Sequence, residues 1–562
     1  MPVTLPRTSS EALERQLGPK PSKWGMWNLY AALAAACVLR IAVFVHQPAF
    51  GHDEACLGVN LLHRSLVGLL RPLDFNQTAP PLFLVLTKML VNVLGPAEWV
   101  FRLIPVAAAL TTVLLLARLA TRLLGTDVAA FTLWLAAFSP LALVYSNVFK
   151  QYSSDTLATV LLLSFALPVF EDPEPLRHWM ALGAAGCVLL LFSQPAIFVA
   201  AGIVMAFVSQ RNLRRGRLLV RCAVMSLAWT LFFAIVYATL YRPVASSPYM
   251  QRFWSNVISA SLAYRGPRGV GELFGGDMLP LGLPGAIGLS LVVVGAVAIW
   301  IRRGTTITVL LTAPYAFLLA AFFLGKFPVY ERLVLFMSPF LFLLIGAALA
   351  TIVSGMYRRW QPFAAAIIPL ACIVFFVINW PLWPTWSDNT RAVLKSRLQG
   401  GYAGEPVFIF PRSIPSWAFY TSDWSSNPRR YDWFVRAYRF GSLSFGDMPS
   451  RSAHPIENAA PPELSDLHRP EFLGLYSGVE NTVPMINSEE PDPGWAAHEV
   501  MQLRQIAHPC VWLYSFQSRT GELIAIRGAL KEAGAQVTVA APLTQSPVAL
   551  PGLERICWDS RK

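Results

Sequence analysis

Charged side chains are scarce in this chain. Asp, Glu, Lys and Arg make up 14% of its 562 residues, whereas 55% are hydrophobic and the mean hydropathy is +0.49. This scarcity excludes an ordinary soluble globular protein, in which about 25% of residues are charged. Apolar runs recur from residue 26 to about residue 380, and about twenty such residues in a helix cross the roughly 30 Å hydrocarbon core of a bilayer. The composition therefore predicts an integral membrane protein.

Cysteine is also rare, and neither a CxxC pair nor a cluster of His and Cys indicates structural zinc. Four of the seven cysteines lie in apolar runs, where a thiol packs as a small hydrophobic group: Cys37, Cys187, Cys222 and Cys372. Cys510 and Cys557 follow the last apolar run. A disulfide between them is one possibility that stays open, because the sequence does not give their separation.

The net charge of +13 does not indicate a nucleic-acid partner, because the basic residues do not gather in one tract. They form short clusters between apolar runs: Arg7, Arg15, Lys20 and Lys23; Arg118 and Arg122; Arg211, Arg214, Arg215 and Arg217; Arg302 and Arg303; Arg358 and Arg359. The positive-inside rule assigns such clusters to the cytoplasm. The first apolar run is too long for a cleavable signal peptide and is predicted to stay as an anchor.

Charge and hydropathy together predict about eleven transmembrane helices with the N-terminus inside. The predicted spans are about 26–45, 99–117, 127–144, 156–170, 179–193, 196–209, 222–240, 281–300, 305–324, 333–353 and 362–381. This organisation gives a cytoplasmic tail (1–25), a transmembrane domain (26–382) and an extracytoplasmic C-terminal domain (383–562).

The outside loop 46–98 is predicted to hold two helices that lie in the membrane interface. The first starts near Asp53 and separates Leu62, Leu66, Leu69 and Leu70 from Asn60, His63, Arg64 and Arg71. The second, Pro80 to Leu94, is apolar but short, and crossing the membrane there would place Arg118 and Arg122 outside.

The C-terminal domain is predicted to be a small α/β fold. Strand-like runs occur at 407–410, 511–514 and 537–539, and helical patterns occur at 390–398 and 521–533. The stretch 440–500 is rich in Pro, Ser, Glu and Asn and is predicted to be an irregular insert.

Three features in order resemble the GT-C superfamily of membrane glycosyltransferases. They are the first span ending in Asp53-Glu54, the Pro80-Pro81 entry to the second loop helix, and the run Lys326-Phe327-Pro328-Val329-Tyr330-Glu331-Arg332 before a late span. The likeness is to the bacterial branch of dolichyl-phosphate-mannose mannosyltransferase-like, aminoarabinose-transferase-like and lipopolysaccharide galacturonosyltransferase-like enzymes. It implies transfer of a sugar from a polyprenyl-phosphate donor to an acceptor hydroxyl on a glycan, lipid or protein at the extracytoplasmic face of a bacterial inner membrane.

Asp53 is the expected general base, which takes the proton from the acceptor hydroxyl as it attacks the anomeric carbon. A single displacement of this kind inverts the anomeric centre. The alternative for Asp53 is to serve only as the N-cap of the following helix. Glu54 is expected to support the site by orienting Asp53 or the acceptor, or to complement the positive end of the helix.

The resemblance places further donor-contacting residues in the outside turn 146–155. Lys150 would bind the donor phosphate, Tyr152 would contact the sugar, and Asp155 would bind a cation or orient Lys150. The alternatives are that Lys150 and Tyr152 anchor the chain at the membrane interface and that Asp155 caps the next helix.

Lys326, Tyr330 and Arg332 form a third outside cluster, and Arg332 is the expected phosphate clamp because guanidinium offers planar bidentate donors. Its alternatives are snorkelling or an ion pair with Glu331. Arg40, within the first span, either reaches the same phosphate or snorkels.

His52 beside the carboxylates invites a divalent metal, but one His and two carboxylates are a weak signal, and no metal is predicted to be required. Two other functions stay open: a lipid-glycan transporter or flippase, and a ligase that moves a whole glycan from a diphosphate carrier. The polar residues concentrate at the outer mouths of the spans rather than at mid-depth, which favours the enzyme.

Overall fold

The computed structural model describes residues 23–46, 49–210, 216–247, 250–251, 254–255, 271–357, 359–379, 405–421, 431, 435, 438, 482–484, 493–506, 510–515, 520–542 and 551–558. It divides into two compact units. The first unit contains Met1–Gln47, Ala79–Thr87 and Arg102–Pro381, and the second contains Pro48–Thr78, Lys88–Phe101 and Leu382–Lys562.

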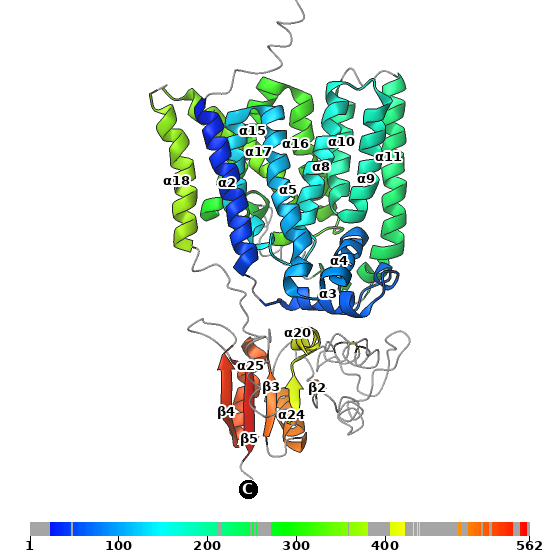
Figure 1. Ribbon diagram of the computed structural model, residues 1–562, viewed down its shortest axis with the longest axis vertical. Helices are drawn as coiled ribbons and strands as arrows, with labels where there is room; N and C mark the ends of the chain where they lie inside the picture. The colour runs from blue at the N-terminus through cyan, green and yellow to red at the C-terminus, as the bar shows by residue number, and fades with distance from the viewer. Residues whose placement is uncertain are drawn as a thin grey trace, which may run out of the picture. The chain divides into compact units, whose positions relative to one another are not determined.

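The first unit is a bundle of helices (Figure 1). Its helices are α2 (Lys23–His46), α5 (Glu98–Leu124), α6 (Thr126–Phe138), α7 (Pro140–Val144), α8 (Tyr152–Glu171), α9 (Leu176–Phe192), α10 (Ala196–Ser209), α11 (Gly216–Val236), α12 (Arg242–Ala245), α15 (Gly285–Arg303), α16 (Thr305–Phe323), α17 (Ser338–Gly355) and α18 (Gln361–Asn379). Helix α5 begins in the second unit, and α4 (Pro81–Leu94) is shared between the two units.

Eight helices in the described part of the chain are long and apolar enough to cross a membrane. They correspond to eight of the eleven predicted spans: α2, α5, α8, α11, α15, α16, α17 and α18. The other three predicted spans are the shorter apolar helices α6, α9 and α10, with 13, 17 and 14 residues. The predicted fold class, a polytopic helical membrane protein with a C-terminal α/β domain, is confirmed.

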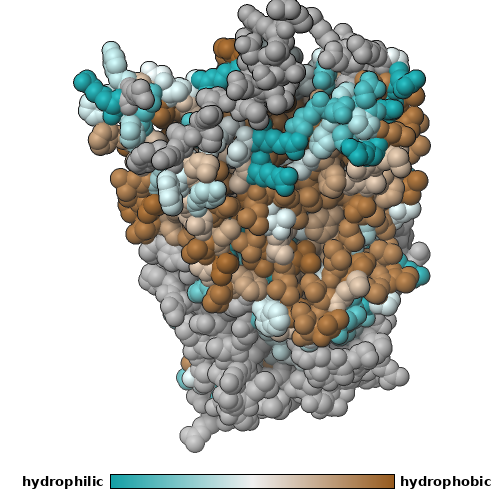
Figure 2. Space-filling view, turned by 45° about the horizontal axis from the view of Figure 1, so that its top comes forward, coloured by the Kyte–Doolittle hydropathy of each residue, from teal (hydrophilic) through white to brown (hydrophobic). Residues whose placement is uncertain are grey.

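Small residues allow the helices of the first unit to approach closely. A Cβ added to Gly295 in α15 would lie 1.8 Å from the backbone oxygen of Leu344 in α17, and one added to Gly186 in α9 would lie 2.2 Å from the Trp229 ring in α11. Helices in lipid depend on such contacts because water is not there to drive them together. On the face shown in Figure 2, hydrophobic side chains form a broad band, and hydrophilic ones gather beyond one of its edges.

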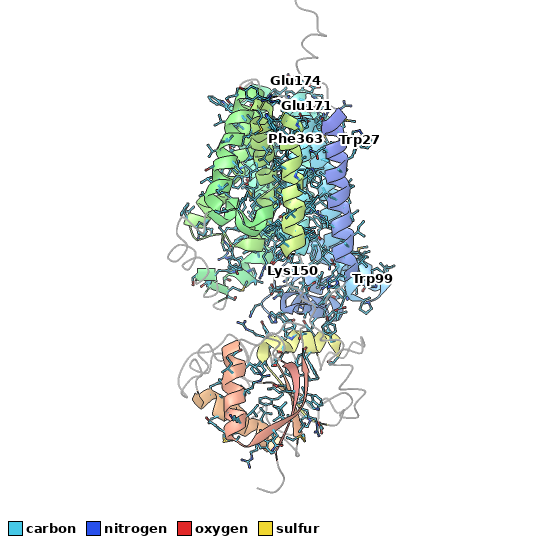
Figure 3. All side chains as sticks on the ribbon, turned by 90° about the vertical axis from the view of Figure 1, so that its left-hand side faces the viewer. Trp27, Trp99, Lys150, Glu171, Glu174 and Phe363 are labelled. Atoms are coloured by element: carbon cyan, nitrogen blue, oxygen red, sulfur yellow. A yellow bond between two sulfur atoms is a disulfide. The ribbon has the colours of Figure 1, made fainter. Side chains whose placement is uncertain are left out.

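The two ends of the bundle differ in their polar residues. Arg122, near the end of α5, forms an ion pair with Glu171, the last residue of α8. Lys150, just before α8, lies at the opposite end of the bundle from Glu171 (Figure 3). The predicted cytoplasmic cluster and the predicted outside turn therefore occupy opposite ends.

The second unit combines the loop helix α3 (His52–His63) with a five-stranded sheet. The strands are β1 (Val407–Ile409), β2 (Thr482–Pro484), β3 (Cys510–Tyr514), β4 (Ala535–Pro542) and β5 (Pro551–Trp558), in the order β2-β1-β3-β5-β4. Strand β1 is parallel to β2 and β3, whereas β5 is antiparallel to both of its neighbours. The helices of the domain are α20 (Ile414–Tyr420), α24 (Pro493–Ile506) and α25 (Thr520–Glu532).

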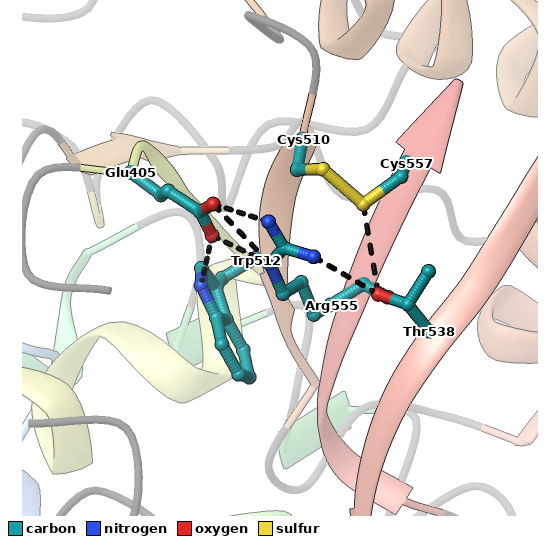
Figure 4. The surroundings of a disulfide bond; sticks show 6 residues. All are labelled: Glu405, Cys510, Trp512, Thr538, Arg555 and Cys557. Carbon is teal, nitrogen blue, oxygen red and sulfur yellow. Dashed lines mark hydrogen bonds and ion pairs between the residues drawn. A yellow bond between two sulfur atoms is a disulfide. The ribbon is translucent and has the colours of Figure 1, made fainter. Parts of the chain in front are cut away.

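A disulfide and a buried hydrophobic core stabilise the sheet. Cys510 in β3 and Cys557 in β5 lie opposite each other and are disulfide-bonded. Beside them, Glu405 accepts hydrogen bonds from the Arg555 guanidinium and from the Trp512 indole, at 2.9 and 2.7 Å (Figure 4). The core gathers apolar side chains from the strands and from α24 and α25: Phe408, Trp495, Leu503, Val511, Leu513, Ile526 and Ile556 among them.

Two local predictions were wrong, one strand was not predicted, and one predicted helix is not tested. The first loop helix ends at His63, not near Arg71, because the Arg64 side chain turns to donate hydrogen bonds to the Gly68 and Pro72 oxygens. The predicted insert 440–500 contains β2 and the start of α24. Strand β5 was missed, since its sequence carries Glu554 and Arg555. The helix expected at 390–398 lies outside the described residues.

Candidate functional site

The acidic pair lies in the first turn of α3, in the second unit. Gly51 is the N-cap, with extended backbone angles (φ −70°, ψ 171°), so the helix begins at His52 rather than at Asp53. The Glu54 carboxylate accepts a hydrogen bond of 3.0 Å from the Gly51 backbone N–H, as the third residue of a capping box does. The capping alternative for Asp53 is therefore wrong. Glu54 caps the helix.

Asp53 is the second helical residue and is partly exposed, whereas Glu54 is buried. The positive end of the helix dipole stabilises negative charge at this position. Asp53 is thus within reach of solvent, as a general base must be.

The imidazole of His52 is engaged at both nitrogens. Its Nδ1 lies 2.7 Å from the Arg412 backbone oxygen, and since a carbonyl only accepts, Nδ1 carries the proton. Its Nε2 lies 3.5 Å from the Cys56 Sγ. No group of three or more His, Cys, Asp or Glu that could hold a metal occurs in the ranges that the structure describes.

Polar contacts that the sequence did not predict hold the C-terminal half of α3. The fully buried Asn60 side chain donates to the Asp74 backbone oxygen at 3.1 Å and accepts from the Asp74 N–H at 2.9 Å. Lys88 donates to the Leu61 oxygen near the end of the helix. Burial lowers the pKa of this lysine. The signal that was available is an Asn on a helix that is otherwise apolar between Ala55 and Leu62.

The predicted donor-contacting turn belongs to the first unit and is anchored at several points. Lys150 is only 5% exposed. The Asn147 side chain donates to the Val43 oxygen of α2 at 2.9 Å, and the Phe149 ring stacks on Phe83 with centroids 5.8 Å apart. These contacts fix the backbone on both sides of Val148 and hold Lys150 in place.

The structure brings together two predicted residues that are 180 positions apart. Arg332 Nε donates to the Tyr152 hydroxyl at 3.1 Å, and the guanidinium lies over the Tyr152 ring, 6.0 Å from its centroid. A second bond joins the segments that carry Tyr152 and Arg332: the Thr159 hydroxyl of α8 donates to the Phe336 oxygen at 3.0 Å. Arg332 is thus held by its contacts with Tyr152 at the start of α8.

Asp155, in the first turn of α8, is a buried carboxylate with an unsatisfied oxygen. Its Oδ1 has no hydrogen-bond partner in the described part of the chain, and neither does the adjacent Ser154 hydroxyl. Ser193 and Tyr241 lie close to this carboxylate. Neither was predicted: Ser193 directly follows α9, and Tyr241 is the last residue of the short helix Tyr237–Tyr241 that follows α11. A buried ionisable side chain among membrane-spanning helices marks a candidate functional position, and an unsatisfied oxygen there can accept a hydrogen bond from a ligand.

The remaining predicted residues lie in different environments. Lys326 is exposed and Tyr330 is partly buried. Arg40 is 3% exposed, and its terminal nitrogens donate to the oxygens of Ala36 and Ala136, each at 3.0 Å. The snorkelling alternative for Arg40 is therefore wrong, because its guanidinium joins α2 to α6 inside the bundle.

Comparison with known proteins supports the resemblance that the sequence predicted. Residues 78–241 match the family model described as dolichyl-phosphate-mannose-protein mannosyltransferase. This segment begins in the loop after α3 and includes Lys150, Tyr152, Asp155, Ser193 and Tyr241. No curated protein matches the sequence.

Solved structures of two enzymes are similar to this chain over most of its length. ArnT from Cupriavidus metallidurans in the apo state has 13% sequence identity, over 94% of this chain and 97% of that chain, with a TM-score of 0.47. The apo oligosaccharyltransferase of Archaeoglobus fulgidus has 11% identity, over 90% of this chain and 71% of that chain, with a TM-score of 0.49. ArnT bound to undecaprenyl phosphate has 13% identity, over 95% and 98% of the two chains, with a TM-score of 0.39.

The chain is thus an integral membrane protein, and over residues 78–241 it is similar to the dolichyl-phosphate-mannose-protein mannosyltransferase family.

Proposed function

We propose that this chain transfers a sugar from a polyprenyl-phosphate donor to a hydroxyl of a cell-envelope glycan, lipid or protein. The match of residues 78–241 to a family named for a lipid-phosphate sugar donor supports the donor class. The physical requirement agrees with it. A lipid-linked donor keeps its carrier in the bilayer and its sugar at the interface, so the enzyme needs transmembrane helices together with polar groups at their ends.

Asp53 acts as the general base in this proposal. The acceptor O–H gives its proton to the Asp53 carboxylate, the acceptor oxygen bonds to the anomeric carbon, and the bond from that carbon to the phosphate oxygen breaks. The polyprenyl phosphate leaves as an anion and needs no proton. The observation that carries this assignment is the division of roles in α3: Glu54 caps the helix, so capping does not account for Asp53.

Cationic side chains stabilise the leaving phosphate. Arg332 has a planar guanidinium that can bind phosphate through two nitrogens. The bond from its Nε to the Tyr152 hydroxyl orients the terminal nitrogens of this group. Lys150 is a second candidate, because its backbone is fixed on both sides. Arg40 is the weakest candidate, since two of its nitrogens already donate to backbone oxygens.

The reaction is proposed to occur on the extracytoplasmic face of a bacterial inner membrane, with the N-terminus in the cytoplasm. The Cys510–Cys557 disulfide supports this orientation, because disulfides persist in oxidising compartments such as the periplasm and are rare in the cytosol. The positively charged clusters support it independently.

Transfer by the purified protein in lipid nanodiscs tests the proposal. The substrates are polyprenyl-phosphate sugars and envelope extracts, and mass spectrometry follows the acceptors. We expect a defined mass increase on one acceptor class and an inverted anomeric centre by NMR. Retention would contradict the single displacement. Movement of the lipid between leaflets without any transfer would contradict the enzyme and favour a transporter.

A further inference from the structure

The helix that carries Asp53 packs against α20 of the C-terminal sequence, within the second unit. The Phe419 ring covers Gly58 of α3 so closely that a Cβ there would lie 2.9 Å from the ring. Phe419 also packs on Phe50, just before α3, with ring centroids 4.7 Å apart, and on Phe101 at 5.8 Å. All three rings are buried.

A hydroxyl group at the end of α20 joins the two sides of this contact. The Phe50 backbone N–H donates to the Tyr420 hydroxyl at 2.6 Å, and that hydroxyl donates to the Glu98 carboxylate at the start of α5. Because Phe50 directly precedes the N-cap Gly51, this bond fixes the backbone that leads into the first turn of α3. The bond from His52 Nδ1 to the Arg412 oxygen fixes the same turn from a second point.

We propose that Tyr420 is a positioning residue for the reaction: its hydroxyl, held by Glu98, sets the backbone at Phe50 and thereby the place of Asp53. This inference rests on the proposed function of Asp53. Misplacing a reacting group by about 1 Å can cost on the order of 100-fold in rate, so a hydroxyl that never meets the substrate can still control turnover. The C-terminal domain then contributes to catalysis through α20.

The test measures kcat and KM for the lipid-linked donor in full-length protein. We expect Tyr420→Phe to lower kcat about tenfold or more, as loss of a hydrogen bond to a charged group would, with KM changed less than about twofold. Glu98→Gln keeps an oxygen that accepts from Tyr420 and should retain kcat within about threefold. Melting temperatures show whether each variant folds.

Tyr514→Phe is the matched control. It removes another hydroxyl of the same domain, which lies 3.1 Å from the Oγ of Ser416 in α20. Equal losses of kcat in both Tyr→Phe variants would show a general loss of domain stability and overturn the proposal. So would an unchanged kcat in Tyr420→Phe.

Asp53→Asn separates this inference from the proposed function. If Asp53→Asn is inactive while Tyr420→Phe matches the wild type, only the positioning role fails. If Asp53→Asn keeps full activity, the base assignment fails and the positioning role fails with it.

Discussion

The disulfide between Cys510 and Cys557 makes a quantitative prediction about the C-terminal domain. The two cysteines are 47 positions apart, so the cross-link closes a loop of that length in the unfolded chain. The loop-closure entropy for this length corresponds to about 4 kcal/mol of stabilisation at 25 °C. For a domain of about 150–250 residues, that value corresponds to a shift in melting temperature of roughly 10 °C.

The perturbation is the double variant Cys510→Ser/Cys557→Ser, compared with wild type before and after treatment with dithiothreitol. We expect the unfolding transition of the C-terminal domain, followed by limited proteolysis on heating, to occur at lower temperature in the double variant and in reduced wild type. The reductant should have no further effect on the variant. Equal transitions in all samples, or reaction of both thiols with a maleimide in the untreated folded protein, would refute the reasoning.

Three further predictions concern packing, phosphate binding and pH. Gly295→Ala should destabilise the helix bundle by about 1–3 kcal/mol, because its Cβ would meet the Leu344 oxygen, whereas Gly355→Ala, which faces open space, should melt like wild type in detergent. Arg332→Lys should lower the rate of transfer roughly 10- to 100-fold, because lysine lacks the planar fork, and donor titrations would show whether the charge alone suffices. Burial raises the pKa of the Glu554 carboxyl above its ordinary 4.5, so the stability of the C-terminal domain should fall as the pH rises from 4.5 through the raised pKa. Glu554→Gln should flatten the dependence of the melting temperature on pH. Parallel curves for the variant and the wild type would contradict this.

The membrane helices could be predicted because each one is a long apolar segment bounded by charge. An apolar segment does not show how many of its residues form one continuous helix. The segments of α6, α9 and α10 were therefore predicted as spans, although their helices are shorter. In the C-terminal domain, the strands around Phe408 and Leu513 were predictable from their β-branched and aromatic runs. Strand β5 was not, since its charged residues Glu554 and Arg555 pair with residues at distant positions, Arg527 and Glu405.

The acidic pair was predicted as a site, but the roles within it depended on one local geometry. The sequence left Asp53 as a possible N-cap and Glu54 as a possible complement to the positive end of the helix, and the register of the first turn gives the capping role to Glu54. The contact between Tyr152 and Arg332 and the place of Ser193 beside Asp155 depend on packing between helices far apart in the chain. No spacing in the sequence encodes such contacts.

The most direct test of the central claim compares single-turnover transfer by wild type, Asp53→Asn and Glu54→Gln. Gln at the third helical position still accepts from the Gly51 N–H, so this variant reports on the cap without its charge. If Asp53 is the base, Asp53→Asn should lower the rate of transfer about 10²- to 10⁴-fold with donor binding and melting temperature preserved. A rate for Asp53→Asn equal to that of wild type would contradict the account.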